Sequence, residues 1–235
     1  MALKLYLAMT GAEMQNCSEP PAHSAWMACH FSPYGSGISN VPPLLMPGSM
    51  LILNDRIPPQ GHDPHLVAQQ LAHVAVTLEA TRVLLDFQRP GDPQTREIAE
   101  AVVTALPCPV GVTAQYASVL SCPVFLTPAL NKPLADQLAL WTDREVWLEA
   151  ALDCQDAILT EAGCTFMSAD VPESPAYCHT DAPLHCRYCI SPEETCVRFT
   201  IWREWDHLQT LLQEAESLGV DCAVGLYQQL RNYNI

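Results

Sequence analysis

The chain has 235 residues, of which 49% are apolar and 16% are charged. This composition supports a large buried core and excludes a disordered protein. Its 11 basic and 26 acidic residues give a formal net charge of −15. That sign is wrong for neutralising phosphates, so we expect neither nucleic acid nor a membrane as partner.

The N-terminal residues 3–9 are expected to form the first strand. Their short alternating pattern lacks the long apolar region of a signal peptide, so we expect a cytoplasmic protein. A stretch rich in proline, glycine and serine follows at 11–48. Irregular segments of this length often carry function, and we expect a loop that folds over one end of the molecule. Within it, Ala25 to Phe31 has the pattern of a short strand.

From residue 49 onward, strand-like runs alternate with amphipathic helical patterns. Asp63-Pro64 and Asp92-Pro93 each supply an N-cap and a proline at the first helical position. Further helices are expected at 133–141, 154–162 and 204–218, and an irregular segment at 169–195. The expected strands are 3–9, 50–55, 82–87, 109–115, 123–127, 145–150, 196–202 and 222–227.

Strands that alternate with helices predict parallel β-structure with right-handed crossovers. Eight strands in 235 residues favour a single α/β domain over 1–235, a TIM-barrel-like (β/α)8 fold with some helices shortened. The alternative is an open doubly wound sheet. No Gly-x-Gly-x-x-Gly motif follows a strand and no phosphate-binding Gly-x-x-x-x-Gly-Lys-Ser/Thr motif occurs, so we expect no nucleotide cofactor.

The strand at 82–87 changes character along its length. Side chains alternate between the two faces of a strand, so Leu84, Asp86 and Gln88 share one face. That face becomes polar only at the C-terminal end of the strand, where barrels and open α/β sheets place their ligand sites. Asp86 beside Arg89 also has a purely structural interpretation, as a buried ion pair.

Most of the expected strands end in residues that hydrogen-bond or stack on a ring. Acids, amides and aromatic rings together are typical of a sugar site, because aromatic faces stack on pyranose rings and carboxylates bind hydroxyls or transfer protons. Polar residues also gather at strand ends simply because these ends meet water. The candidate catalytic residues are Asp86 and Glu149, and the candidate substrate-binding residues are Asp55, Gln88, Gln115, Tyr116, Trp147, Trp202 and Tyr227.

The sequence Leu84-Leu-Asp-Phe-Gln88 resembles the end of the catalytic strand of chitinase-like, family-18 type glycoside hydrolases. In that family the strand reads roughly Asp-x-x-Asp-x-Asp-x-Glu, and the final glutamate is the general acid. The resemblance implies that Asp86 matches the last aspartate, which helps the acetamido group of the substrate to act as nucleophile. Gln88 then occupies the position of the acid, and the upstream aspartates are absent.

These residues predict a carbohydrate-binding or degenerate glycoside-hydrolase-like barrel, with a small-molecule or glycan ligand and no metal or other cofactor. One alternative is an active hydrolase with Glu149 or Asp86 as the acid. Glu149 shares a face with Trp147, and an adjacent indole would raise the pKa of a carboxylic acid there. A second alternative is a zinc-binding or structural protein that uses the cysteines of the segment Cys178–Cys196.

Overall fold

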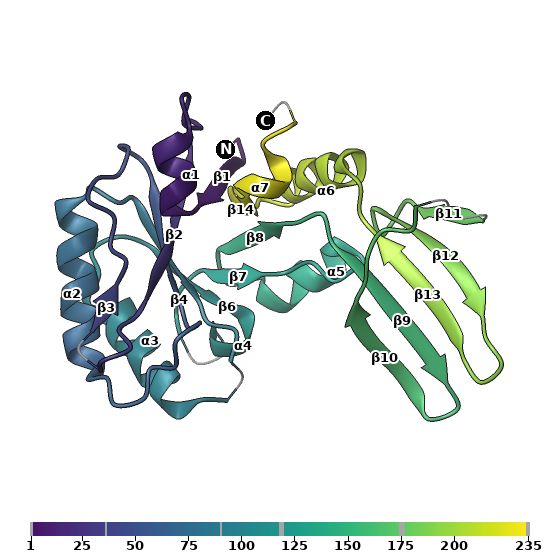
Figure 1. Cartoon of the computed structure of the whole chain (residues 1–235), viewed down its shortest axis with the longest axis horizontal. Coiled ribbons are helices and arrows are strands. Elements are labelled where there is room, and N and C mark those ends of the chain that lie inside the picture. The colour runs from purple at the N-terminus through teal and green to yellow at the C-terminus, as the bar shows by residue number, and fades with distance from the viewer. Residues whose placement is uncertain (1, 36, 90, 118–119, 174–176, 234–235) are drawn as a thin grey trace. The chain divides into compact units, whose positions relative to one another are not determined.

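The computed structural model describes residues 2–35, 37–89, 91–117, 120–173 and 177–233 (Figure 1). The chain divides into two compact units. The barrel unit comprises Ala2–Thr127, Trp141–Glu149 and Val220–Ile235, and the second unit comprises Pro128–Leu140 and Ala150–Gly219. The expected single domain over 1–235 stays a prediction, because compactness alone does not say whether the units unfold together.

Eight strands close into a ring in the order in which they occur along the chain. Each pairs with its neighbours, the register is parallel, and β1 closes the ring by pairing with both β2 and β14. The (β/α)8 barrel expected from the sequence is therefore confirmed, and the open sheet is excluded. The barrel strands are β1 (Lys4–Met9), β2 (Ser24–Phe31), β4 (Met50–Asn54), β5 (Arg82–Asp86), β6 (Val110–Thr113), β7 (Val124–Leu126), β8 (Val146–Ala150) and β14 (Cys222–Leu226).

Alternate residues of these strands separate into two apolar clusters. One fills the inside of the barrel and includes Ile52, Leu84 and Trp147, drawn from three different strands. The other lies between the strands and the outer helices and includes Val83 and Leu85. The period of two along these strands therefore identifies the face of their residues. Strand β2 departs from this period, because its register shifts between Trp26 and Cys29 and both residues lie in the outer cluster.

Helices α2 (Pro64–Thr77) and α3 (Pro93–Ala105) pack on the outer cluster. Asp63 and Asp92 cap them as the sequence predicts. Asp63 accepts hydrogen bonds from the backbone N–H groups of His65 and Leu66, and Asp92 accepts one from that of Gln94. None of the helices in the described part of the chain is both long and apolar enough to cross a lipid bilayer. The short elements of the barrel unit are α1 (Gly11–Asn16), β3 (Ile38–Ser39), α4 (Ala114–Ala117) and α7 (Tyr227–Leu230).

The N-terminal end of the barrel is closed by the guanidinium of Arg82. It donates hydrogen bonds to the Tyr6 hydroxyl at 3.0 Å and to Asp221 Oδ2 at 3.4 Å, and its Cζ atom lies 5.6 Å from the ring centroid of Trp147. A cation held by an anion and by aromatic faces is well compensated for its loss of water. This end of the barrel is therefore structural.

The second unit contains a five-stranded antiparallel sheet in the order β10-β9-β13-β12-β11. Figure 1 draws β9, β10, β12 and β13 as long neighbouring arrows. The helices of this unit are α5 (Leu134–Leu138), the 3-10 turn η1 (Ala139–Trp141, ending in the barrel unit) and α6 (Trp205–Ser217). The strands are β9 (Cys154–Thr160), β10 (Gly163–Ser168), β11 (Cys178–Asp181), β12 (Cys186–Pro192) and β13 (Val197–Trp202).

The expected count of eight barrel strands is right, but one member of the set is wrong. The run 196–202 forms β13, which pairs antiparallel with β9 and β12 and is no barrel strand. Its place in the barrel is taken by β2, the short strand expected at Ala25 to Phe31. An alternating run indicates a half-buried strand but does not indicate which strand pairs with it, because the pairing depends on residues far away in the sequence.

Four further expectations need correction. Residues 154–162, expected as a helix, form β9 and its turn, and the segment 169–195, expected to be irregular, contains β11 and β12; residues 174–176 lie outside the described part. The strand expected at 109–115 ends at Thr113, where α4 begins. The loop expected at 11–48 contains α1, whose start is fixed by a capping box between Thr10 and Glu13.

Candidate functional site at the carboxyl end of the barrel

Asp86 lies on the inner face of the barrel, at the C-terminal end of β5. It stands two residues after Leu84, which belongs to the inner cluster. The side-chain amide of Gln88 donates a hydrogen bond to Asp86 Oδ1 at 2.5 Å. Burial raises the pKa of the Asp86 carboxyl above its ordinary value, the Gln88 hydrogen bond opposes this rise, and the nearby charge of Asp55 adds to it.

Glu149 occupies the equivalent position on β8. It follows Trp147 of the inner cluster by two residues, and therefore shares the inner face. The hydroxyl of Thr127, just beyond the end of β7, donates a hydrogen bond to Glu149 Oε2 at 2.5 Å. The two predicted catalytic carboxylates thus lie on the same face and at the same end of the barrel, and each is oriented by a neighbouring donor.

The carboxylate of Asp55 has a different role from those of Asp86 and Glu149. Its side chain is 3% exposed, and its two carboxylate oxygens accept hydrogen bonds from the backbone N–H groups of Gln88 at 3.0 Å and Arg89 at 2.8 Å. The Arg89 guanidinium donates to the carbonyls of Asp55 and Arg56. Asp55 therefore holds the segment that follows β5 in place. The Arg89 guanidinium binds these carbonyl oxygens and does not form the ion pair with Asp86 that the sequence also allowed.

Gln115 and Tyr116 lie in α4 rather than on a strand. The Gln115 amide donates to the backbone carbonyl of Phe87, and the buried Tyr116 hydroxyl donates to the carbonyl of Arg89. Tyr116 also packs edge-on against the Phe87 ring, with centroids 6.1 Å apart. Both side chains therefore support the segment that follows β5, which carries Gln88.

The two tryptophans expected to stack on a sugar are buried. Trp147 is 0% exposed and donates from Nε1 to Glu145 at 2.6 Å. Trp202 is 1% exposed, ends β13 in the second unit, and has Arg187 Cζ 5.5 Å from its ring centroid. Neither indole presents an open face in this structure, so sugar stacking at these rings stays a prediction that requires them to move.

Tyr227 begins α7, directly after β14. Its hydroxyl lies 3.5 Å from the Cys17 sulfur, and the two residues line a hollow of about 250 Å³ together with Asn16 and Arg231. The hydrogen bond with Cys17 raises the pKa of the phenol. Its predicted role in substrate binding remains a prediction.

Two polar residues near the C-terminal strand ends were missed by sequence reasoning. Asn54 ends β4 on the inner face, and its amide donates to the carbonyls of Met27 and Cys29 of β2 at 3.0 Å and 2.8 Å. Thr113 ends β6 and donates to the carbonyl of Phe87 at 2.8 Å. Alternation along the strand could have identified both residues, because each follows an inner-face residue by two positions.

The cysteine segment gives no ligand set for a metal among the described residues. No three histidine, cysteine, aspartate or glutamate side chains converge there or elsewhere in the described ranges. Cys178 faces Cys189 across β11 and β12, whereas Cys186 is buried with its sulfur toward the carbonyl of Leu130. The zinc-binding alternative therefore gains no support from the geometry.

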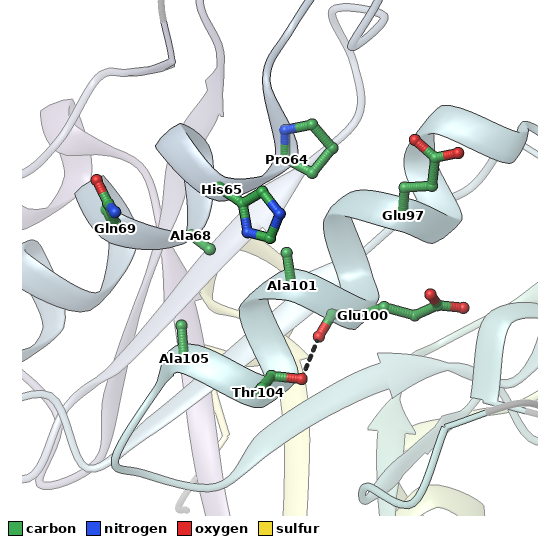
Figure 2. A pocket seen from close by; sticks show the side chains of 9 residues that line it. All are labelled: Pro64, His65, Ala68, Gln69, Glu97, Glu100, Ala101, Thr104 and Ala105. Carbon is green, nitrogen blue, oxygen red and sulfur yellow. Dashed lines mark hydrogen bonds between the residues drawn. The ribbon is translucent and has the colours of Figure 1, made fainter.

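A groove of about 540 Å³ lies between α2 and α3, on the outside of the barrel (Figure 2). Its floor is made by small side chains such as Ala68 and Ala101, and its borders carry His65, Glu97 and Glu100. None of the predicted site residues lines it. The groove and the carboxyl end of the barrel are thus separate candidate sites.

Comparison with known proteins supports the fold. No protein-family model and no curated protein sequence matches the chain. Among solved structures, the chitinase of Chromobacterium violaceum is similar, with 10% identity, a TM-score of 0.55, and coverage of 95% of this chain and 93% of that one. The spore cortex-lytic enzyme SleL of Bacillus cereus has 9% identity, a TM-score of 0.55, and coverage of 95% and 70%. The chain therefore has a glycoside-hydrolase-like barrel fold, as the Asp86–Gln88 resemblance implies.

Proposed function

We propose that the barrel binds a glycan containing N-acetylated amino sugars at the C-terminal ends of its strands, and that it has lost most or all hydrolytic power. The observation that carries this proposal is the placing of Asp86 and Glu149 on one inner face, each held by a hydrogen-bond donor. Oriented carboxylates are the groups that bind sugar hydroxyl and acetamido groups.

The loss of hydrolysis is inferred from Gln88. An amide has no titrating proton to give to a leaving group, and general acid catalysis typically contributes about 10²- to 10⁴-fold. The Gln88 amide instead donates its hydrogen bond to Asp86. A site of this kind holds a sugar without cleaving it.

An active hydrolase is the second candidate, and the raised pKa of Asp86 is the observation in its favour. A carboxyl that stays protonated nearer to neutral pH is able to act as a general acid. In this version Asp86, or Glu149 beside Thr127, would protonate the leaving group. The sugar class is suggested by the Asp86–Gln88 resemblance and by the similar chitinase.

Titration of the 235-residue chain with chitotetraose, with cellotetraose as the ligand that lacks acetamido groups, tests the proposal. We expect chitotetraose to bind and Asp86→Asn and Glu149→Gln each to raise its Kd about tenfold, which equals about 1.4 kcal/mol. Glu100→Gln, in the groove between α2 and α3, is the matched control and should leave the Kd unchanged. Failure of chitotetraose to bind, or a loss of binding only in Glu100→Gln, would contradict the proposal.

Hydrolysis of aryl N-acetylglucosaminides by the same protein separates the two candidates. Binding without turnover supports the degenerate barrel. Turnover that is lost in Asp86→Asn or Glu149→Gln supports the active enzyme.

A further inference from the structure

Strand β10 forms an edge of the antiparallel sheet in the second unit. In the part of the chain that the structure describes, it pairs only with β9, and all six of its residues are exposed. Its sequence, Gly163-Cys-Thr-Phe-Met-Ser168, contains neither a charged residue nor a proline. Charged residues and prolines are the features by which sheet edges usually avoid pairing with other chains, and β10 lacks both.

The outward-facing backbone groups of β10 follow from its pairing with β9. The N–H of Ala169 donates to the carbonyl of Cys154, which is its partner when the β10–β9 register is continued by one residue. Hydrogen-bonded and non-hydrogen-bonded pairs alternate along an antiparallel ladder. The N–H and C=O groups of Cys164, Phe166 and Ser168 therefore point away from β9, off the edge of the sheet.

We propose that β10 is a self-association surface, at which the β10 strands of two copies of this chain pair antiparallel about a two-fold axis at Phe166. Opposed residues of an antiparallel pair share one face, so the axis must pass through a residue. Centred on Phe166, the pairing sets Cys164 of each copy opposite Ser168 of the other. All three outward-facing residues then exchange backbone hydrogen bonds across the axis.

A second copy fits this edge because the edge is complementary to itself. The pairing joins Phe166, which is 48% exposed, to its own symmetry mate on one face, and joins Thr165 to Met167 on the other. Aromatic pairs and aliphatic contacts across strands are stabilising, whereas like charges directly opposite are not. No charged side chain lies among the five residues that pair with one another, Cys164 to Ser168, although the chain as a whole carries −15.

Charge does oppose the pairing beyond these five residues. Continuing the register brings Glu161 of one copy near Asp170 of the other, so the carboxylates repel at both ends of the paired strands. Salt screens this repulsion. We therefore expect a weak dimer whose Kd falls as the salt concentration rises, which is the opposite of the response of a dimer held by ion pairs.

Sedimentation equilibrium of the 235-residue chain tests the proposal. Because the pairing of five residues from each strand is a small interface, we expect concentration-dependent dimers at protein concentrations up to about 1 mM. Phe166→Lys places two ammonium groups face to face and should raise the Kd about tenfold or more. The matched control is Ile190→Lys, which makes the same charge change on the same sheet face at a residue of similar exposure, 42%, on the interior strand β12.

A dimer in wild type and in Ile190→Lys, together with a monomer in Phe166→Lys, supports the proposal. A wild-type monomer throughout this concentration range overturns it. A dimer that persists in Phe166→Lys also overturns it, since association must then use another surface.

Disulfide trapping then checks the register. Ser168→Cys sets a new thiol opposite the native Cys164 of the other copy, and mild oxidation should give a covalent dimer whose formation is abolished by adding Cys164→Ser. A register centred on Thr165 would instead bring Cys164 opposite residue 166. Covalent dimers from Phe166→Cys but not from Ser168→Cys would overturn the proposed axis at Phe166.

Discussion

The amide of Gln88, two residues beyond the end of β5, donates its hydrogen bond to Asp86 Oδ1 at 2.5 Å. Because this bond joins the two side chains, a change at position 88 acts directly on the carboxyl at position 86. The first two predictions follow from this relationship.

Gln88→Glu should create a protonatable pair. Two carboxyls this close disfavour double ionisation, so one pKa of the pair rises and a proton is held near neutral pH. We expect measurable hydrolysis of an aryl N-acetylglucosaminide, with little from the parent protein, because acid assistance typically contributes about 10²- to 10⁴-fold. Gln88→Met is the control that removes the amide without adding an acid. A folded Gln88→Glu protein that binds the sugar but does not turn it over would refute this prediction.

Asp86→Asn should stabilise the protein at neutral pH. Burial raises the pKa of Asp86 in the folded state, so the folded protein favours the protonated form. Its favourable contribution is complete below the unfolded-state pKa of about 3.9 and is lost as the pH rises through the folded-state pKa. Urea unfolding at several pH values should therefore give an advantage to Asp86→Asn at pH 7 that disappears near pH 3. A pH-independent difference would contradict the assignment.

Asp55→Ala should destabilise the fold strongly. The substitution leaves the backbone N–H groups of Gln88 and Arg89 without the acceptors that they have in the wild type. We expect a loss of about 2–4 kcal/mol in the free energy of unfolding. Asp143→Asn, at an exposed loop position, should change the stability by less than about 0.5 kcal/mol. Equal effects of the two variants would show that Asp55 does not organise this segment.

Gly111→Ala should disturb the inside of the barrel. A Cβ atom at position 111 would lie 2.3 Å from Cε3 of the buried Trp147 indole. Overpacking of this kind costs about 1–3 kcal/mol. In a double-mutant cycle, Trp147→Phe should recover part of the loss, because the smaller ring leaves space for the methyl group. Additive effects in the cycle would mean that the two positions do not contact each other.

The expected single domain leads to a calorimetric prediction. The second unit is made of two separate segments, Pro128–Leu140 and Ala150–Gly219, so the chain joins it to the barrel unit at both ends of each segment. We expect one thermal transition with equal calorimetric and van't Hoff enthalpies. Two separate transitions would establish two domains.

Local patterns in the sequence were sufficient to predict the barrel. Helix caps at Asp63 and Asp92 and the apolar runs of β4 and β5 are local signals, and the structure confirms them. The pairing of 196–202 was not predictable in this way, because strand partners depend on residues far away in the sequence. The strand at 25–31 lacked clear boundaries, since it lies within a stretch rich in proline and glycine.

Local patterns likewise indicate only part of the candidate site. Alternation along β5 and β8 correctly places Asp86 and Glu149 on one face. No local pattern indicates that Asp55 accepts two backbone hydrogen bonds or that Trp147 is packed inside the barrel. Those outcomes depend on which groups fill the remaining space once the barrel has closed.

The order of the strands also has a consequence for synthesis on the ribosome. β1 closes the ring by pairing with β14, and Lys4 lies opposite Cys222. The seven barrel strands before β14 therefore leave the ribosome first, and one edge of β1 and one edge of β8 stay unpaired until β14 emerges. Exposed edges of nascent chains are prone to aggregation. A nascent chain stalled before residue 220 should accordingly recruit chaperones that the released, closed barrel no longer binds.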